Sequence, residues 1–474
     1  MNSDSPMMRR VRADFLKTKI PRKGRIRFLL AIIILAAAIH TGINLKKNEN
    51  KGQGKETPGS ELTERKAEKE TNKSAAGKAK RRAAKKNIKR QKPVEQNKRN
   101  QSGLVLPFTF GDLSDLIKKN PPGLFKDKDS IKYRGKDLTV HYSVNTQLQE
   151  LGQSLLKRYH PLYGAIAAVH PATGRVLVLL SYKNDSVPDL GVLYCKSLFP
   201  AASLYKTITA AAAIETANLS PESLLPHAGR NHTLYRFQLE KELKNYIEIP
   251  LEDAFALSIN PVFARIGLYS LSKGTLLEYG NRFGFNCPIP FEIETEISRV
   301  ISPDSAFALA ELASGFNQQT TISPVHGAMI AAAISENGRM QKPVLIDSIY
   351  MGDTCIYKAA KETWKIPIKE STSKELKKMM SRVSRHGTAR KSFRYIHQSR
   401  RFSEIEYGGK TGSVDKDGIG RVDWFIGFAR NPLEKEQQIA ISVVTVHGPN
   451  WTVHSAYIAA EIMRIYIRSL DTKQ

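Results

Sequence analysis

The sequence Phe199-Pro-Ala-Ala-Ser-Leu-Tyr-Lys-Thr-Ile-Thr-Ala-Ala-Ala-Ala-Ile-Glu215 gives the first indication of both fold and chemistry. An alanine-rich run follows Pro200, so we expect a helix to begin near Ser203. Ser203 and Lys206 are three residues apart and would share one face of its first turn. A serine hydroxyl is a weak nucleophile at neutral pH, and an adjacent amine can activate it as a base. The segment therefore suggests an activated serine at a helix N-terminus, where the dipole favours an alkoxide.

The Ser203/Lys206 pair is a weak signal by itself, because Ser-x-x-Lys recurs elsewhere in the same chain. Ser154/Lys157, Ser270/Lys273 and Ser371/Lys374 are examples. Residues elsewhere in the chain must therefore decide whether Ser203 is a nucleophile.

Two further motifs follow the pair at wide spacing. Ser258-Ile-Asn260 comes at the end of a helical pattern, although Ser-x-Asn occurs twice more in the chain. Lys410-Thr-Gly-Ser413 contains the only Lys-Thr-Gly of the chain, and two glycines precede it. Glycines beside a strand allow another backbone to approach closely. A lysine and two hydroxyl groups at such a place could hold a carboxylate.

These three motifs, in this order, are similar to those of penicillin-binding proteins and serine β-lactamases, with Asn260 at the third position of the second motif. From about Leu138 to Leu470 the chain resembles the transpeptidase domain of a penicillin-binding protein. The resemblance extends to Val140–Gln149, to His170-Pro-Ala-Thr-Gly174, to Ala313-Ser-Gly-Phe316 through Ile322-Ser-Pro324 to Glu336-Asn-Gly338, and to Asp423-Trp-Phe-Ile-Gly-Phe428.

The resemblance implies catalytic roles for three residues. Ser203 would attack the carbonyl of a D-Ala-D-Ala peptide and form an acyl-enzyme. Lys206 would take the serine proton, which requires a neutral amine, and burial together with the nearby Lys410 would favour that form. Ser258 would relay a proton to the leaving D-alanine.

The resemblance also implies a substrate-binding set, made of Asn260, Lys410, Thr411, Gly412 and Ser413. Asn260 would hydrogen-bond the peptide backbone of the substrate. Thr411 and Ser413 would bind its terminal carboxylate in the field of Lys410, and the backbone N–H groups of Ser203 and Ser413 would form an oxyanion hole. This chemistry needs no metal and no cofactor.

The hydrophobic patterns predict an α+β domain, an antiparallel sheet flanked by helices. Residues 164–170 and 175–181 flank a Pro/Gly turn and are expected to form a hairpin of two central strands. Further strands are expected at 407–413, 423–428 and 439–446, so the sheet would join early and late sequence. Helices are expected at 144–159 and 454–470, and helical patterns dominate residues 203–383. Trp424 is expected in the core.

The N-terminal part suggests a membrane anchor followed by a linker. The predicted segments are a basic cytoplasmic stretch at 1–27, a transmembrane helix at 28–45, a disordered Lys/Arg-rich linker at 46–100, a short extension or reduced pedestal at 101–137, and the transpeptidase domain at 138–474. A cleaved signal peptide is the alternative, since Ala36-Ala37-Ala38 offers a cleavage site. With the resemblance, this order predicts a single-pass protein of the bacterial cytoplasmic membrane, its catalytic domain on the extracytoplasmic side.

The charge is concentrated outside the globular region. The formal net charge is +28, of which residues 1–27 carry +7 and residues 46–100 carry +12, leaving +9 for residues 101–474. This distribution argues against nucleic acid as the partner of the domain. The three cysteines have no metal-like spacing and are interpreted as buried thiols, with a single disulfide as the alternative.

The function that we expect is that of a peptidoglycan D,D-transpeptidase, which cross-links stem peptides and binds β-lactams as inhibitors. D,D-carboxypeptidases and β-lactamases use the same residues and differ in the acceptor of the acyl group. Two alternatives of another class are a sensor that binds β-lactam or wall peptide without turnover and a polyanion-binding protein that acts through its basic linker. Residues 46–137 leave no folded room for a glycan-polymerising domain, so a membrane glycan polymerase is an expected partner.

Overall fold

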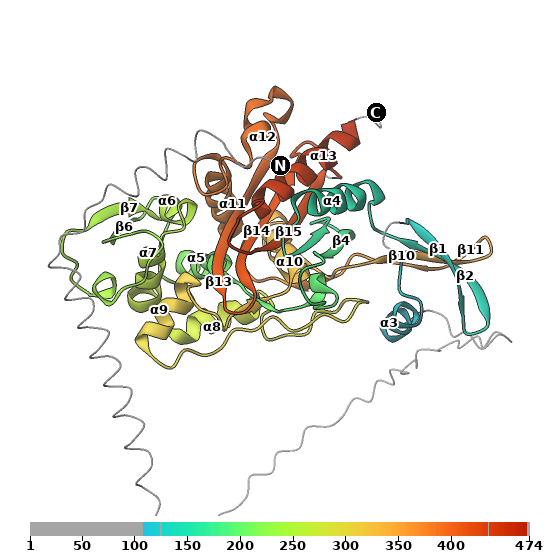
Figure 1. Ribbon diagram of the computed structural model, residues 1–474, viewed down its shortest axis with the longest axis horizontal. Coiled ribbons are helices and arrows are strands. Elements are labelled where there is room, and N and C mark those ends of the chain that lie inside the picture. The colour runs from blue at the N-terminus through green and yellow to red at the C-terminus, as the bar shows by residue number, and fades with distance from the viewer. Residues whose placement is uncertain (1–107, 124–125, 435, 472–474) are drawn as a thin grey trace, which may run out of the picture. The chain divides into compact units, whose positions relative to one another are not determined.

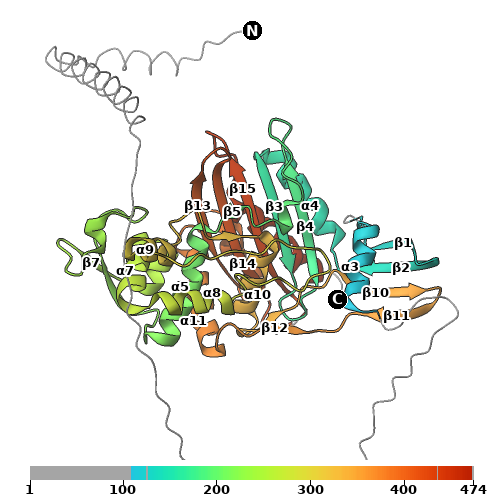
Figure 2. The same cartoon turned by 90° about the horizontal axis from the view of Figure 1, so that it is seen from below.

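In the computed structural model (Figures 1 and 2), the described residues are 108–123, 126–434 and 436–471. The predicted basic segment 1–27, membrane anchor 28–45 and linker 46–100 lie outside these residues. Within the described ranges, no helix combines the length and the apolar character that crossing a membrane requires.

The largest sheet has five antiparallel strands in the order β13-β14-β15-β3-β4 (Figure 2). The strands are β3 (Tyr163–Val169), β4 (Val176–Lys183), β13 (Glu406–Lys416), β14 (Gly420–Arg430) and β15 (Gln438–His447). β3 pairs with β15, so that Ala167 lies opposite Ser442. This pairing confirms that the sheet joins early and late sequence, as its strand pattern predicted.

The expectation that β3 and β4 are both central strands is wrong for β4, which lies at the edge of the sheet. Its residues Val176–Leu180 are nevertheless buried. Helix α4 (Thr146–Tyr159) packs against β4, and the short segment Leu193–Cys195 also contacts it. A strand whose sides are covered in this way reads as a continuous apolar run, so hydrophobicity alone cannot distinguish it from a central strand.

Helices cover both faces of the large sheet. They are α4 (Thr146–Tyr159), α10 (Pro324–Ser335), α11 (Glu370–Arg385) and α13 (Ser455–Asp471). A side chain on Gly327 of α10 would meet Ser442, whereas one on Gly152 of α4 would meet Ile166 and Ile462 of α13. Ile166 lies opposite Val443, the neighbour of Ser442, and successive strand residues face opposite sides. Helix α10 therefore covers one face, and α4 and α13 cover the other.

A second sheet of four strands has the order β1-β2-β10-β11. Its strands are β1 (Lys128–Tyr133), β2 (Lys136–Tyr142), β10 (Ile346–Met351) and β11 (Thr354–Lys358). The predicted boundary between residues 137 and 138 falls inside β2, so this sheet draws strands from both predicted segments. The middle region is also less helical than its pattern indicated, because β10 and β11 and several short strands interrupt it.

The other helices and short strands connect these layers. The helices are α3 (Phe110–Lys119), α5 (Lys206–Thr216), α6 (Leu251–Ala256), α7 (Asn260–Arg265), α8 (Lys273–Arg282), α9 (Ala306–Ser314) and α12 (Arg394–Gln398), with the shorter segments η1 (Leu193–Cys195), η2 (Ala202–Tyr205), η3 (Arg236–Leu239), η4 (Ile266–Ser270) and η5 (Arg400–Phe402). The short strands are β5 (Phe199–Pro200), β6 (Leu224–His227), β7 (Ile247–Pro250), β8 (Thr321–Ile322), β9 (Met340–Gln341) and β12 (Thr363–Lys365).

The three cysteines are free thiols. Cys195 is buried, Cys287 is half-buried and Cys355 is exposed. The interpretation as buried thiols is therefore correct for Cys195 and wrong for Cys355, which lies on β11 at the edge of the second sheet.

Candidate active site

Ser203 lies in the 3₁₀ turn η2, and the α-helix α5 begins at Lys206. The predicted helix start is therefore confirmed, with a tighter first turn than an α-helix has. Ala202 has a positive φ of 50°, an unusual conformation for a residue with a side chain. The Lys206 Nζ atom lies 2.7 Å from the Ser203 Oγ atom, so the turn places the amine against the hydroxyl.

A hydrogen bond from Trp424 of β14 connects this turn to the large sheet. The Trp424 ring is fully buried, which confirms its predicted core position, and its Nε1 donates a hydrogen bond of 2.9 Å to the Pro200 carbonyl. A second hydrogen bond positions the turn, because the Ala201 N–H donates to the Thr320 carbonyl at 2.7 Å. Buried backbone groups that are paired in this way hold the serine turn in one position.

The second motif occupies the short connection between α6 and α7. Ser258 adopts a positive φ of 56°, and Asn260 is the first residue of α7. Because a non-glycine residue in this conformation is strained, such positions gather at functional sites. The Asn260 Oδ1 atom accepts a hydrogen bond of 2.7 Å from Lys206 Nζ, and Ser258 Oγ accepts one of 2.9 Å from Lys410 Nζ.

The third motif lies on β13, whose glycines are close to neighbouring backbone as predicted. A Cβ atom on Gly408 would lie 2.5 Å from the Ser381 nitrogen of α11, and one on Gly412 would lie 3.3 Å from the Ser203 nitrogen. Lys410 is fully buried, and its Nζ also donates to the Thr411 carbonyl at 2.8 Å. β13 is thus packed between α11 and the serine turn.

All eight predicted site residues come together in this region. Six of them line one cavity of about 560 Å³, which is open to solvent on one side: Ser203, Ser258, Asn260, Thr411, Gly412 and Ser413. Lys206 and Lys410 lie fully buried next to it and reach Ser203 and Ser258 with their amines. The site therefore combines a serine hydroxyl, two amines and a set of polar groups from three separate segments.

The two buried amines have depressed pKa values. Burial, and then the charge of Lys410, lowers the pKa of Lys206 well below its ordinary value of 10.5. Burial lowers the pKa of Lys410 to about 7. Neither amine forms an ion pair with a carboxylate of the described residues. Desolvation disfavours the charged form, so the neutral amine beside Ser203 is more accessible than in an ordinary lysine.

The sequence interpretation missed several contributors to the site. The Ser314 carbonyl accepts a third hydrogen bond from Lys206 Nζ at 2.6 Å, and Thr388 Oγ1 lies 2.5 Å from Thr411 Oγ1. Gly315 and His232 also line the cavity. The segment that contains Ser314 and Gly315 had matched the family pattern, which was a usable signal. Nothing in the residue types marked Thr388 or His232.

Gly315 gives a test of how tightly the serine turn is held. Its φ is +67°, and a Cβ atom there would lie 2.0 Å from the Ala202 carbonyl oxygen and 3.1 Å from the Ser203 nitrogen. We expect Gly315→Ala to lower the free energy of unfolding by about 2–4 kcal/mol, more than the ~1–2 kcal/mol cost of the left-handed conformation alone. Because the clash displaces Ser203, acylation of the protein by a fluorescent penicillin should also slow, by roughly 100-fold.

Gly352→Ala is the matched control for this prediction. Gly352 has a φ of +58°, yet nothing lies within 4 Å of a Cβ atom placed there. In denaturant unfolding, Gly352→Ala should therefore lower the free energy of unfolding only by the cost of the left-handed conformation. Its acylation rate should equal that of the wild type. Equal losses in the two variants would contradict a specific contact between Gly315 and the serine turn.

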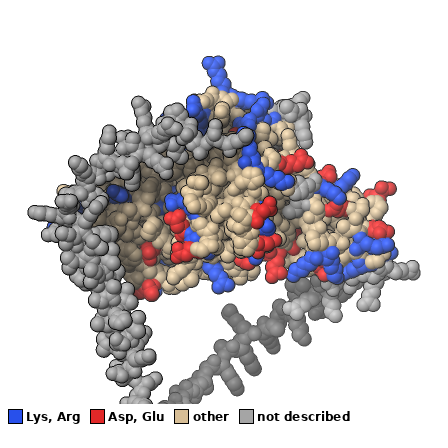
Figure 3. All heavy atoms as spheres, viewed as in Figure 1, with Lys and Arg blue, Asp and Glu red and all other residues tan. Residues whose placement is uncertain are grey.

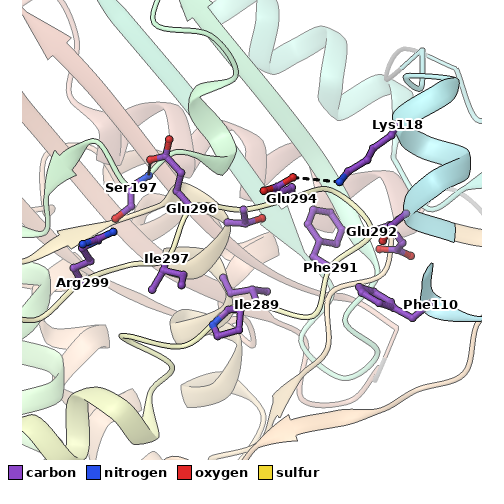
Figure 4. Close-up of a pocket in the computed structure, with 13 residues that line it drawn as sticks. Phe110, Lys118, Ser197, Ile289, Phe291, Glu292, Glu294, Glu296, Ile297 and Arg299 are labelled. Atoms are coloured by element: carbon purple, nitrogen blue, oxygen red, sulfur yellow. Dashed lines mark hydrogen bonds and ion pairs between the residues drawn. The ribbon is translucent and has the colours of Figure 1, made fainter. Parts of the chain in front are cut away.

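A second cavity, of about 620 Å³, lies between α3 and the segment 288–299 (Figure 4). Glu294 forms an ion pair of 3.3 Å with Lys118 there. Glu292 accepts hydrogen bonds from the Leu345 and Ile346 N–H groups, and burial raises its pKa to about 7. Glu292 and Glu294 thus interact with groups of the protein itself, and the described residues that line this cavity do not pair a hydroxyl with a buried amine as Ser203 and Lys206 do.

Comparisons with known proteins agree with this geometry. The family model described as the penicillin binding protein transpeptidase domain matches residues 164–465. Stage V sporulation protein D of Bacillus subtilis is 25% identical over 367 residues, which cover 71% of this chain and 54% of that protein. Peptidoglycan D,D-transpeptidase PbpA of Mycobacterium tuberculosis is 25% identical over 252 residues, 44% of this chain and 48% of the relative. The chain thus spans about half the length of the curated relatives it matches.

Solved structures share the fold at low sequence identity. The D,D-transpeptidase domain of a peptidoglycan glycosyltransferase from Eggerthella lenta superposes with a TM-score of 0.58 at 20% identity, covering 70% of this chain and 84% of that one. PBPA from Mycobacterium tuberculosis superposes with a TM-score of 0.57 at 22% identity, covering 70% and 81%. A ceftriaxone acyl-enzyme complex of the same protein superposes at 0.57 with 21% identity, covering 70% and 79%.

Proposed function

Because this chain belongs to the penicillin-binding protein transpeptidase family, we propose that it is a D,D-transpeptidase that cross-links peptidoglycan stem peptides through an acyl-enzyme on Ser203. The observation that carries the proposal is the contact of 2.7 Å between Ser203 Oγ and the buried amine of Lys206. No carboxylate of the described residues pairs with that amine, so it can act as a base without first losing an ionic partner.

Acylation would begin with the transfer of the Ser203 proton to the neutral Lys206 amine. The Ser203 oxygen then bonds to the carbonyl carbon of the penultimate D-alanine, and the C–N bond to the terminal D-alanine breaks. The leaving nitrogen needs one proton, which Ser258 relays; Lys410 Nζ, 2.9 Å from Ser258 Oγ, can resupply it. Each proton transfer in this sequence has a donor and an acceptor within the site.

The negative charge on the carbonyl oxygen would be stabilised by the backbone N–H groups of Ser203 and Ser413. The close approach of Gly412 to the Ser203 nitrogen supports this assignment, because it brings β13 beside the serine turn. One such donor is worth about 3–4 kcal/mol in acyl transfer. Thr411, Ser413 and Lys410 would hold the terminal carboxylate, and Asn260 would bind the peptide backbone.

The choice between transfer of the acyl group to an amine and its hydrolysis depends on the acidic residues that line the cavity. The carboxylates among its described lining residues are Asp415 and Asp423. Asp423 accepts a hydrogen bond of 2.7 Å from the Ser455 N–H, and Asp415 forms an ion pair of 3.2 Å with Arg421. Asp415 is thus engaged in an exposed ion pair, whereas burial raises the pKa of Asp423 to about 7. Asp423 is therefore the carboxyl group of the described lining that could activate water, and detection of a cross-linked rather than a hydrolysed product decides between the two outcomes.

The proposal extends to the setting of the enzyme. The apolar run at 28–45 and the basic residues before it support a single membrane anchor with the catalytic domain on the extracytoplasmic side. A glycan polymerase in the same membrane would then supply the strands that this domain cross-links. These features follow from the sequence pattern and the family, and the described residues begin at Phe108.

The test is product analysis with the full-length protein in detergent, a donor pentapeptide ending in D-Ala-D-Ala, and an acceptor peptide with a free amine. Mass spectrometry should detect a cross-linked product together with released D-alanine. A donor that ends in L-Ala-L-Ala is the control and should give no product. Release of D-alanine with a tetrapeptide alone would identify a carboxypeptidase, and an adduct without turnover would identify a sensor.

A further inference from the structure

A cleft of about 1040 Å³ opens beside the candidate active site, and Lys or Arg residues dominate its charged lining. The cations are Arg385, Arg390, Lys391 and Arg394, and the described lining residues include no Asp or Glu. All four side chains are exposed, and none has a carboxylate partner within the described part of the chain. Lys and Arg side chains gather over α12 in Figure 3, and Arg394 begins that helix. We call this feature the basic cleft.

The basic cleft adjoins the active-site cavity. Thr388 and His454 line both, and Thr388 Oγ1 lies 2.5 Å from Thr411 Oγ1 of the third motif. The turn that carries Thr388 is also bound to helix α6, which precedes the second motif, because the Thr388 N–H donates to the Ala256 carbonyl at 3.1 Å. A ligand in the cleft would therefore lie at a defined position relative to the serine.

The cations are crowded, and their mutual repulsion is not relieved by the protein itself. Burial, and after it the charges of Arg385 and Arg390 among others, lowers the pKa of His397. Burial and then Lys391 lower the pKa of His454. Arg385 is held in place by stacking over the Tyr407 ring at 4.8 Å and by a hydrogen bond to Ser381. Positioned cations without acidic partners are typical of a site that receives an anion.

We propose that the basic cleft binds the acceptor peptide of the cross-linking reaction through free carboxylates near its nucleophilic amine. This inference rests on the proposed transpeptidase function. The carboxylate of the donor is already accounted for by Thr411 and Ser413, and it departs with D-alanine when the acyl-enzyme forms. The acceptor must then bring an amine to Ser203 through the open side of the cavity. Thr388 and His454, which line this cavity, also line the cleft.

The cationic surroundings would also assist the reaction itself. An ammonium group cannot attack the acyl-enzyme, and nearby positive charges disfavour the protonated form of an amine. An acceptor whose carboxylates neutralise part of the cleft would still present its amine in a positive field. The cleft would thus select an anionic acceptor peptide and lower the pKa of its attacking amine at the same time.

The experiment compares the full-length protein with the triple variant Arg390→Gln/Lys391→Gln/Arg394→Gln. We expect the KM for an acceptor with free carboxylates to rise about tenfold, since each exposed charge pair contributes up to a few-fold. The KM for the same acceptor with amidated carboxylates should not change, and the rate of acylation by penicillin should stay within about twofold, because acylation uses none of these three cations. The triple variant Lys128→Gln/Lys132→Gln/Lys358→Gln, which removes three exposed cations from the second sheet, is the control and should match the wild type.

The results separate a failure of the acceptor-binding proposal from a failure of the proposed transpeptidase function. If wild-type protein forms no acyl-enzyme, the transpeptidase proposal fails; binding of the fluorescently labelled carboxylate acceptor, followed by anisotropy, still tests the cleft. An unchanged KM and an unchanged anisotropy titration in the first triple variant would overturn the inference. Equal losses with the free and the amidated acceptor would overturn it as well, because they would reflect altered structure rather than recognition of charge.

Discussion

Ser203→Ala is expected to abolish acylation by penicillin, with a loss in rate of about 10⁴ or more, as for the removal of other serine nucleophiles. The fold should be retained, because Lys206 Nζ keeps its hydrogen bonds to Asn260 Oδ1 and the Ser314 carbonyl. A time course of labelling with fluorescent penicillin measures the loss. Thermal unfolding of the same preparation shows whether the variant is folded.

Ser371→Ala is the matched control for this substitution. Ser371 belongs to another Ser-x-x-Lys pair, but it is exposed on α11, and Lys374 forms an ion pair of 2.9 Å with Glu370. Its labelling should equal that of the wild type. Undiminished labelling of folded Ser203→Ala protein would contradict the assignment of the nucleophile.

Lys206→Met is expected to have the second largest effect, a loss in acylation rate of roughly 10² to 10⁴, the range for removal of a general base. Methionine has a similar volume and suits a buried position, so the cavity should not collapse. The Ser314 carbonyl and Asn260 Oδ1 lose a donor, which costs about 1–3 kcal/mol for a buried group left unpaired. Stopped-flow or quenched labelling gives the rate, and denaturant unfolding gives the stability.

The pH dependence of acylation tests the same residue in the wild-type protein. The amine acts as a base only when neutral, so the rate should fall as the pH drops through the pKa of Lys206, which burial and Lys410 hold well below 10.5. Lys374→Met on the exposed face of α11 is the control and should leave rate and profile unchanged. A rate that keeps rising to pH 10 and above would contradict a depressed pKa for the base.

The site could be predicted from the sequence because its chemistry resides in side chains at fixed spacing. Ser203 and Lys206 are joined by one helical turn, and the only Lys-Thr-Gly of the chain marks β13. The glycines of that strand could be interpreted physically, and the structure confirms that α11 approaches there. These features depend on local geometry, which the order of residues determines directly.

Contributors that act through the backbone could not be predicted in the same way. The Ser314 carbonyl binds Lys206, yet every residue has a carbonyl group. Ala202 and Ser258 adopt positive φ angles that only the packed structure imposes. The edge position of β4 was missed because helices bury it as thoroughly as a central strand.

The basic cleft was also invisible in the sequence. Arg385, Arg390, Lys391 and Arg394 read as ordinary solvent-exposed charges on a helical surface. Only the tertiary structure places them around one hollow beside Thr388, where no carboxylate of the described residues pairs with them. Functional meaning arises here from what surrounds each cation and not from its residue type.

The most direct test of the central claim is peptide mapping of the full-length protein after brief exposure to penicillin. Mass spectrometry should locate a single added penicilloyl group on the peptide that contains Ser203, because the buried amine of Lys206 activates that hydroxyl. An adduct on Ser258, Ser413 or any other residue, or the absence of an adduct on folded protein, would contradict the account.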